Sequence, residues 1–218
     1  MYMERERLQI VEYGKKMSAS GLSRGTSGNL SIYDPETGYM AISPSGIGYF
    51  ETEPEDVVIL DLMGRIVEGS RKPSSEAGMH EAFYRARPEL RAVVHTHSTF
   101  CTVLACLHRP IEALHYVIAD TGADAVPCAP YALFGTPELA QAAVAACGAG
   151  NAVLLANHGM VACGQSLAAA FSLAENVEAL AELQWRCLCA GGAEPLSAAQ
   201  MAEVRERFKT YGQNSEAE

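Results

Sequence analysis

The segment Leu30-Ser-Ile-Tyr-Asp-Pro-Glu-Thr-Gly-Tyr-Met-Ala-Ile-Ser43 contains two short strand-like runs separated by a turn. Residues 30–33 and 39–43 are mostly apolar or aromatic, whereas residues 34–38 include a proline and a glycine, which favour turns. Two strands joined by so short a connection pair in antiparallel fashion. The segment therefore predicts a β-hairpin, around which the rest of the fold can be built.

Other short apolar runs predict further strands. They cover residues 57–62, 65–68, 92–94, 152–156 and 160–163. The first two flank Met63-Gly64 and repeat the hairpin pattern. The run at 92–94 is β-branched and too short for a helix, so His95 is expected at the end of a buried strand. Predicted strands therefore dominate the amino-terminal part of the chain.

Helical periodicity covers most of the remaining chain. The expected helices span residues 4–19, 75–87, a stretch that begins at 98, 136–147, 166–188 and 197–208. Thr136-Pro137 supplies a capping hydroxyl followed by proline at the first helical position. Because strand hairpins precede helices without a regular βαβ rhythm, we expect a single α/β domain over residues 1–218. Its central sheet should be mainly antiparallel, with helices on both faces.

Composition argues against several kinds of partner. The chain has 218 residues, of which 49% are hydrophobic, and this is enough to bury one core. Its net charge of −10 and the lack of a Lys/Arg run argue against nucleic acid. No apolar run approaches the roughly 20 residues of a membrane span, and the amino-terminal residues lack the apolar core of a secretory signal. We therefore expect no membrane partner and a cytoplasmic location.

The seven cysteines form an odd set embedded in apolar runs. This distribution suits buried, reduced thiols better than a disulfide framework.

Three histidines have the sequence context of metal ligands. His95 and His97 alternate at the end of an apolar strand, so their side chains share one face, about 6.6 Å apart along the chain. His158 follows another apolar run and precedes Gly159, where a side chain can emerge into a cleft. One ion with bonds of about 2.1 Å to imidazole nitrogens could bridge His95 and His97, and three histidines in such positions indicate a metal. The alternative for His-x-His is an exposed polar pair. The other histidines, His80, His108 and His115, are expected on the surface or in packing.

Glu76 is the candidate carboxylate. It follows Pro73-Ser74-Ser75 at a predicted helix start, and metal-assisted carbonyl chemistry needs a base to collect or return a proton. The alternative is that Glu76 only complements the helix dipole. The same helix start could bind a phosphate through Ser74, Ser75 and backbone amides.

Together these residues resemble a known family, the class II aldolases of the fuculose-1-phosphate aldolase type. The resemblance covers nearly the whole chain. The matching segments, in order, are Gly25-Thr-Ser-Gly-Asn29, Ile42-Ser-Pro-Ser-Gly-Ile47, Pro73-Ser-Ser-Glu76, Ala92-Val-Val-His-Thr-His97, residues 111–118, Pro127-Cys-Ala-Pro-Tyr131, Phe134-Gly-Thr136, Asn157-His-Gly159 and Phe208-Lys-Thr-Tyr-Gly212.

The resemblance implies a zinc ion, or another divalent ion such as Mn²⁺ or Co²⁺, on His95, His97 and His158, with Glu76 as fourth ligand or base. It also implies a cradle for the phosphate of a sugar substrate. The implied cradle residues are Gly28, Asn29, Ser45, Gly46, Ser74 and Ser75.

The resemblance further implies a homotetramer whose active sites lie between subunits. Tyr116, supplied by a neighbouring subunit, would protonate the aldehyde oxygen during condensation. Tyr211, in a mobile carboxyl-terminal tail from about residue 209, would help close the site.

The implied reaction is cleavage of L-fuculose 1-phosphate, or a close relative, to dihydroxyacetone phosphate and an aldehyde such as lactaldehyde. Thr96 and Ser98 look more like the related pentulose phosphate 4-epimerases, but those usually carry aspartate where Glu76 stands. Aldolases for 5-deoxyribulose or methylthioribulose 1-phosphate remain open, because these sugars share the keto and phosphate end. A metal hydrolase is disfavoured, since H-E-x-x-H is absent. A non-catalytic module like the adducin head would be expected to lack the ligands.

Overall fold

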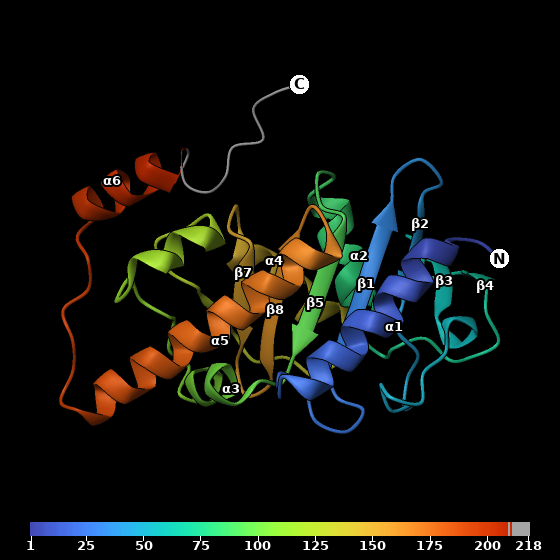
Figure 1. Cartoon of the computed structure of the whole chain (residues 1–218), viewed down its shortest axis with the longest axis horizontal. Coiled ribbons are helices and arrows are strands. Elements are labelled where there is room, and N and C mark those ends of the chain that lie inside the picture. The colour runs from blue at the N-terminus through green and yellow to red at the C-terminus, as the bar shows by residue number, and fades with distance from the viewer. Residues whose placement is uncertain (209, 211–218) are drawn as a thin grey trace.

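The computed structural model describes residues 1–208 and 210. In this part of the chain eight strands form one sheet in the order β4-β3-β2-β1-β5-β8-β7-β6 (Figure 1). The strands are β1 (Asn29–Asp34), β2 (Tyr39–Ile42), β3 (Val58–Asp61), β4 (Ile66–Glu68), β5 (Ala92–Thr96), β6 (Cys128–Ala129), β7 (Ala152–Leu155) and β8 (Gly159–Gly164). The helices are α1 (Glu4–Ala19), α2 (Ala77–Ala86), α3 (Thr99–Cys106), α4 (Pro137–Cys147), α5 (Leu167–Cys189) and α6 (Ala198–Phe208), with short 3-10 helices η1 (Pro54–Asp56) and η2 (Tyr116–Thr121).

The sheet is antiparallel except at one edge. The expected hairpin is β1 and β2, which pair with Ser31 opposite Ile42, and β3 and β4 form the second hairpin. β5 joins the two halves, because it pairs with β1 on one side and β8 on the other. Only the two-residue strand β6 runs parallel to its neighbour β7. The prediction of a mainly antiparallel sheet is confirmed.

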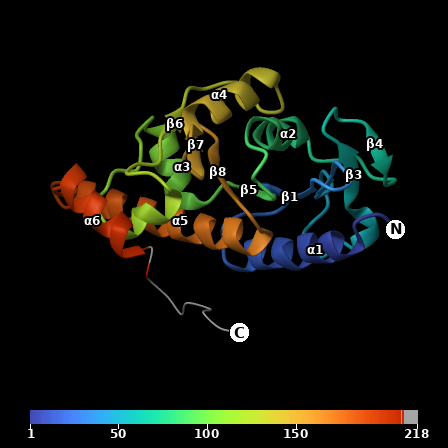
Figure 2. The ribbon, with the colours of Figure 1, turned by 90° about the horizontal axis from the view of Figure 1, so that it is seen from above.

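Helices cover both faces of the sheet, as Figure 2 shows: α2 and α4 lie on one side, and α1 and α5 on the other. Side chains alternate along the strands between the two resulting cores. In β5, Ala92 and Val94 pack in the core with α1, α3 and α5, whereas Val93 packs in the core with α2 and α4. His95 has the same parity as Val93, so it points toward the α2 side.

Five of the six predicted helix starts lie within one residue of the observed ones, whereas α2 begins at Ala77 rather than at residue 75. The Thr136 hydroxyl accepts a hydrogen bond from the Leu139 amide at 3.3 Å, and Ser166 caps α5 through the Ala169 amide at 3.1 Å. Such caps each contribute about 1 kcal/mol. No helix of the described residues has the length and apolar character that crossing a membrane requires.

The expectation that the cysteines are buried is wrong for four of the seven. All are free thiols, but only Cys101, Cys147 and Cys163 are buried. Cys106 and Cys189, the last residues of α3 and α5, are exposed.

Candidate metal centre

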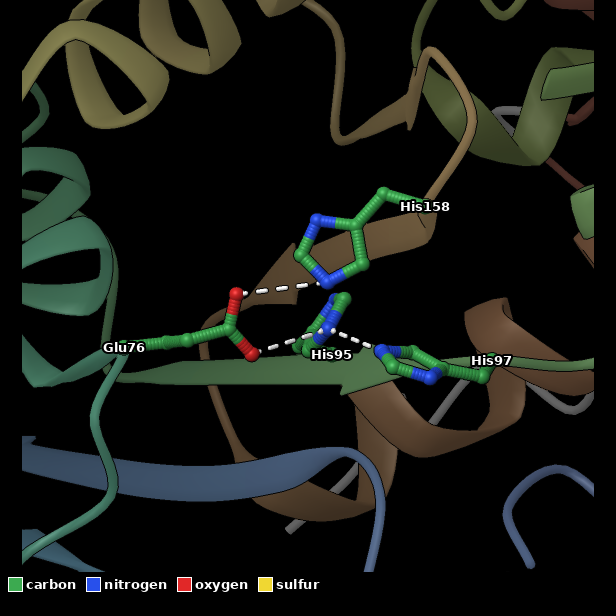
Figure 3. A group of neighbouring side chains, drawn as sticks. All are labelled: Glu76, His95, His97 and His158. Carbon is green, nitrogen blue, oxygen red and sulfur yellow. Dashed lines mark hydrogen bonds and ion pairs between the residues drawn. The ribbon is translucent and has the colours of Figure 1, made fainter. Parts of the chain in front are cut away.

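Three separate parts of the chain deliver the four predicted ligands to one place (Figure 3). β5 carries His95 and leads directly into His97. His158 lies in the turn between β7 and β8, and Glu76 immediately precedes α2. The potential ligand atoms of these four residues all lie within 4.8 Å of one another. Both histidines of the His-x-His motif therefore belong to one cluster. The alternative of an exposed polar pair is wrong for His95, which is fully buried.

The imidazole rings surround a common centre. Their centroids are 4.8 to 4.9 Å apart, and the Nε2 atoms of His95 and His97 are separated by 3.0 Å. Glu76 Oε2 lies 3.1 Å from Nε2 of His95, and Oε1 lies 3.4 Å from Nε2 of His158. The carboxylate thus closes the fourth side of the cluster, as Figure 3 shows.

The residues on both sides of His158 have special backbone requirements. Asn157 has φ 56°, a left-handed conformation that asparagine tolerates better than most residues. Its side-chain oxygen lies 2.6 Å from Nε2 of His108, and its amide bonds the Ala105 carbonyl. At Gly159 a Cβ atom would approach the Thr96 carbonyl oxygen to 2.2 Å, so β8 can pass β5 this closely only with glycine there.

A backbone carbonyl orients His95. Its Nδ1 lies 2.9 Å from the Met160 carbonyl oxygen, which can only accept a hydrogen. Nδ1 therefore carries the proton, and the lone pair of Nε2 points into the cluster. This arrangement is the usual support of a metal-bound histidine.

The cluster has the protonation states that metal binding needs. Burial, with a further contribution from the neighbouring His95, lowers the pKa of His97 and of His158 to about 4. Burial by itself raises the pKa of Glu76, but the neighbouring His95, His158 and Asn29 outweigh burial and hold this pKa well below its usual range. Near neutral pH the site presents lone-pair nitrogens beside a carboxylate.

These residues fit a divalent ion. Glu76 Oε1 is buried without a hydrogen-bond partner among the described residues. Burying an unpaired oxygen costs free energy, and a cation at the centre would remove this cost. The carboxylate caps no helical amide, so the alternative that Glu76 serves only the helix dipole is not supported. Three imidazoles and a carboxylate are a donor set that suits zinc.

A cavity of about 370 Å³ opens beside the cluster. Its wall contains every residue predicted for the phosphate cradle: Gly28, Asn29, Ser45, Gly46, Ser74 and Ser75. Glu76, His97 and His158 line the same cavity, so the predicted cradle and the predicted metal site share one space. The wall also includes residues not predicted to line it, among them Tyr131, Phe134 and Asn157.

The two predicted tyrosines do not join this cavity in the described structure. Tyr116 is half exposed; its ring stacks on His115 at 4.6 Å and lies 6.1 Å from the ring of Phe208. It is absent from the wall that the described residues form. Tyr211 and the tail predicted from about residue 209 lie outside the described residues, apart from Thr210.

His80, expected on the surface or in packing, is a packing residue, because its ring is fully buried. Its place in a buried polar cluster, within hydrogen-bond distance of Asn29 and Ser31, was not predicted. The signal that could have found it is spacing: Glu76, His80 and Tyr84 recur every four residues and so share one helix face.

Comparison with known proteins extends these observations over almost the entire chain. The profile of the family described as Class II Aldolase and Adducin N-terminal domain matches residues 8–185. A 5-deoxy-D-ribulose 1-phosphate aldolase of Bacillus thuringiensis is 46% identical over 98% of this chain and 100% of that protein. The L-fuculose phosphate aldolase of Escherichia coli is 42% identical over 96% of this chain and 98% of that protein. A solved structure of an L-fuculose 1-phosphate aldolase, 42% identical, superposes with a TM-score of 0.93 over 96% of this chain and 98% of that one.

Proposed function

This chain belongs to the class II aldolase and adducin N-terminal domain family, and we propose that it cleaves a ketose 1-phosphate to dihydroxyacetone phosphate and a short aldehyde. Family membership and the similarity to aldolases make it a metal-dependent aldehyde-lyase. The observation that carries the more specific proposal is the shared cavity, in which a four-ligand cluster faces a wall of hydroxyls, amides and glycines.

The proposed ligands are His95, His97, His158 and Glu76, and the proposed ion is zinc, with Mn²⁺ or Co²⁺ as substitutes. A divalent ion held there would act as a Lewis acid toward the negative charge that develops on the substrate carbonyl oxygen. The chain itself fixes the direction of approach, because the buried His95 closes the cluster from the sheet side and the cavity opens on the other.

The proposed phosphate site is the cradle of Gly28, Asn29, Ser45, Gly46, Ser74 and Ser75. Its Ser74 and Ser75 precede α2, and the positive dipole end of a helix favours an anion. The net charge of −10 would repel a sugar phosphate at long range. Neutral donors concentrated at one wall therefore supply the attraction locally.

Glu76 is the proposed proton carrier. When the bond between C3 and C4 of the ketose breaks, the C4 hydroxyl loses its proton and the aldehyde departs with C4 as its carbonyl carbon. The electron pair stays on C3 of the dihydroxyacetone phosphate fragment. Glu76, which borders the cavity with its carboxylate, would take up the proton that the C4 hydroxyl releases and pass it to C3, so that no proton is gained or lost.

Tyr116 is proposed to act on the aldehyde oxygen from a neighbouring subunit of a homotetramer. Support comes from its position, half exposed and outside the cavity wall formed by the described residues of its own chain. Two aromatic residues of that wall, Tyr131 and Phe134, are 61% and 62% exposed, as expected of residues that a partner covers. The proposed location of this assembly is the cytoplasm.

Two substrates are candidates. L-Fuculose 1-phosphate would yield lactaldehyde, and 5-deoxyribulose 1-phosphate, which lacks one carbon, would yield acetaldehyde. The second is supported by the 46% and 45% identity to aldolases named for 5-deoxyribulose 1-phosphate, one of them from Rhodospirillum rubrum and also named for 5-methylthioribulose 1-phosphate. The first is supported by the 42% identity to the fuculose phosphate enzyme.

The test is to incubate zinc-loaded protein with both ketose 1-phosphates, 5-methylthioribulose 1-phosphate and ribulose 5-phosphate. Dihydroxyacetone phosphate is measured by coupled reduction and the aldehyde by chromatography. We expect dihydroxyacetone phosphate from at least one ketose 1-phosphate. Epimerised pentose with no dihydroxyacetone phosphate would contradict the proposal and favour the epimerase alternative; no turnover with an unchanged fold would favour an interaction module.

Glu76→Gln should keep its fold and lose about 100-fold or more in kcat, the range that proton-transfer groups contribute. Glu81→Gln is the matched control, because it neutralises a carboxylate on the same helix that does not line the cavity. Near-normal turnover of the Glu76→Gln protein would remove Glu76 from the mechanism.

A further inference from the structure

A row of polar side chains lies under the metal centre, between α2 and β1. Glu76, His80 and Tyr84 are spaced by four residues and share one face of the helix. Asn29 and Ser31 are spaced by two on the strand and share the face that looks at α2. All five are at most 6% exposed, so none relies on bulk water for its hydrogen bonds.

The five side chains are linked in sequence by short contacts. Asn29 Nδ2 lies 3.0 Å from Glu76 Oε2, and Asn29 Oδ1 lies 2.5 Å from His80 Nε2. His80 Nδ1 lies 2.6 Å from the Ser31 hydroxyl, which lies 2.6 Å from the Tyr84 hydroxyl. The row therefore connects the helix interior to the carboxylate of the metal cluster.

The chemistry of the end group fixes the direction of the hydrogens. An ionised Glu76 only accepts, so Asn29 must present its NH₂ group to it and its carbonyl oxygen to His80. That oxygen only accepts, so His80 must carry its hydrogen on Nε2. A flipped Asn29 would place its oxygen against the carboxylate, two acceptors in contact without a hydrogen between them.

The other end of the row agrees with this direction. Complete burial lowers the pKa of His80 to about 3, so the ring carries a single hydrogen near neutral pH. With Nε2 protonated, Nδ1 accepts from Ser31, and the Ser31 oxygen then accepts from Tyr84. Tyr84 OH also lies 3.1 Å from the Ser31 carbonyl, which again can only accept. Tyr84 has a single hydrogen, which these two oxygens of Ser31 share, and each of the other contacts in the row has one hydrogen and one acceptor.

We infer that His80 is a positioning residue, which holds Asn29 in the one orientation that donates to Glu76 and thereby fixes the Glu76 carboxylate against the histidine cluster. Hydrogen bonds aligned in one direction strengthen one another in a buried environment. Partners that orient a metal ligand in this way typically change metal affinity or activity 10- to 100-fold when removed. The inference rests on the proposed role of Glu76.

The test compares two substitutions of His80 by their effect on zinc affinity, measured by competition with a chromophoric chelator. His80→Leu removes the donor to Asn29, and we expect zinc binding about tenfold weaker. His80→Gln puts an amide nitrogen near the position of Nε2 and keeps the donor, so its zinc affinity should stay within about threefold of the unmodified protein, far from the loss expected of an absent partner.

Phe83→Leu is the matched control. It lies on the same helix, is fully buried and belongs to the core rather than to the row. It should lower thermal stability and leave zinc affinity unchanged. Equal losses of zinc affinity in the Leu and Gln variants at position 80, or a loss in Phe83→Leu of the same size, would show that packing rather than the hydrogen bond is responsible.

A second measurement needs no variant. Long-range ¹H–¹⁵N correlation spectra of the zinc-loaded protein distinguish the two neutral tautomers of His80. The Nε2–H form is expected, and the Nδ1–H form would overturn the inference even if the variants fail to fold. Neither experiment uses a sugar, so failure of the substrate panel with a tenfold loss in His80→Leu would reject the proposed reaction and leave this inference standing.

Discussion

Glu81 is a buried carboxyl group that the site does not use. It lies on α2 at 6% exposure, with Arg85 Nη1 3.5 Å away. Burial raises its pKa above the ordinary 4.5, Arg85 opposes this and Asp61 adds to it. The folded protein therefore holds this proton more tightly than the unfolded chain does, and the stability contribution falls as pH rises above about 4.5.

Glu81→Gln removes this pH-dependent contribution to stability, because glutamine does not titrate. We expect a melting temperature at pH 7 above that of the unmodified protein, and a difference that shrinks as the pH falls toward 4.5. Melting curves of both proteins across this pH range measure it, and titrations common to both cancel in the difference. A lower melting temperature of the variant at pH 7 would mean that the Arg85 ion pair outweighs burial.

The candidate metal ligands could be predicted one by one from the sequence, but the residues that hold them in place could not. His95 and His97 alternate along a strand, and this local rule was enough to put both on one side. His158 and Glu76 were candidates from their own sequence context, but whether they meet His95 and His97 depends on how β8 and α2 pack, and the resemblance to a family supported that grouping. The spacing of Glu76 and His80 puts both on one face of the helix, but the partners of His80, Asn29 and Ser31, lie about 50 residues away, so these contacts could not be predicted from a local pattern.

The start of α3 depends on a side chain from another helix. Its N-cap residue, Ser98, makes no side-chain cap. Instead the carboxylate of Glu178 on α5 accepts hydrogen bonds from the amides of Phe100 and Cys101 at 2.8 and 2.9 Å. These are otherwise unpaired first-turn amides, at the positive end of the helix dipole.

Glu178→Ala should therefore lower the free energy of unfolding by about 2 kcal/mol, the range for hydrogen bonds to a charged group that leave buried donors unpaired. Urea denaturation with an unchanged slope measures the loss. Glu175→Ala is the control, because Glu175 is exposed on the same helix and its removal should change stability by less than about 0.5 kcal/mol. Equal effects of the two substitutions would contradict the assignment of Glu178 as the cap.

Helices and strands with a clear hydrophobic periodicity could be predicted from the sequence, whereas elements that depend on tertiary pairing could not. The expected helix at residues 4–19 is α1, and the capped start at Thr136 is that of α4, because periodicity and capping are local properties. β6 was not predicted. It has two residues and exists as a strand only because β7 offers a parallel edge to it. Strand order likewise depends on tertiary pairing and was not readable.

At the scale of the whole molecule, the candidate metal site brings together elements that are distant along the chain. Glu76 immediately precedes α2, and His158 lies in the turn between β7 and β8. His95 lies in β5, and His97 directly follows it. A cation bound to all of them has no equivalent site in the unfolded chain. Binding therefore adds its free energy to folding.

Removal of the metal should lower the melting temperature. With free zinc at about 100 times its dissociation constant the linkage is worth about 2.7 kcal/mol, and a chain of this size shifts by about 2–4 °C per kcal/mol, so a decrease of about 5–10 °C is expected. Calorimetry before and after dialysis against a chelator, then with zinc restored, measures it. In His158→Ala, which lacks one imidazole of the cluster, the chelator should have a much smaller effect. A chelator-induced decrease of the same size in that variant would place the stabilising ion elsewhere in the protein.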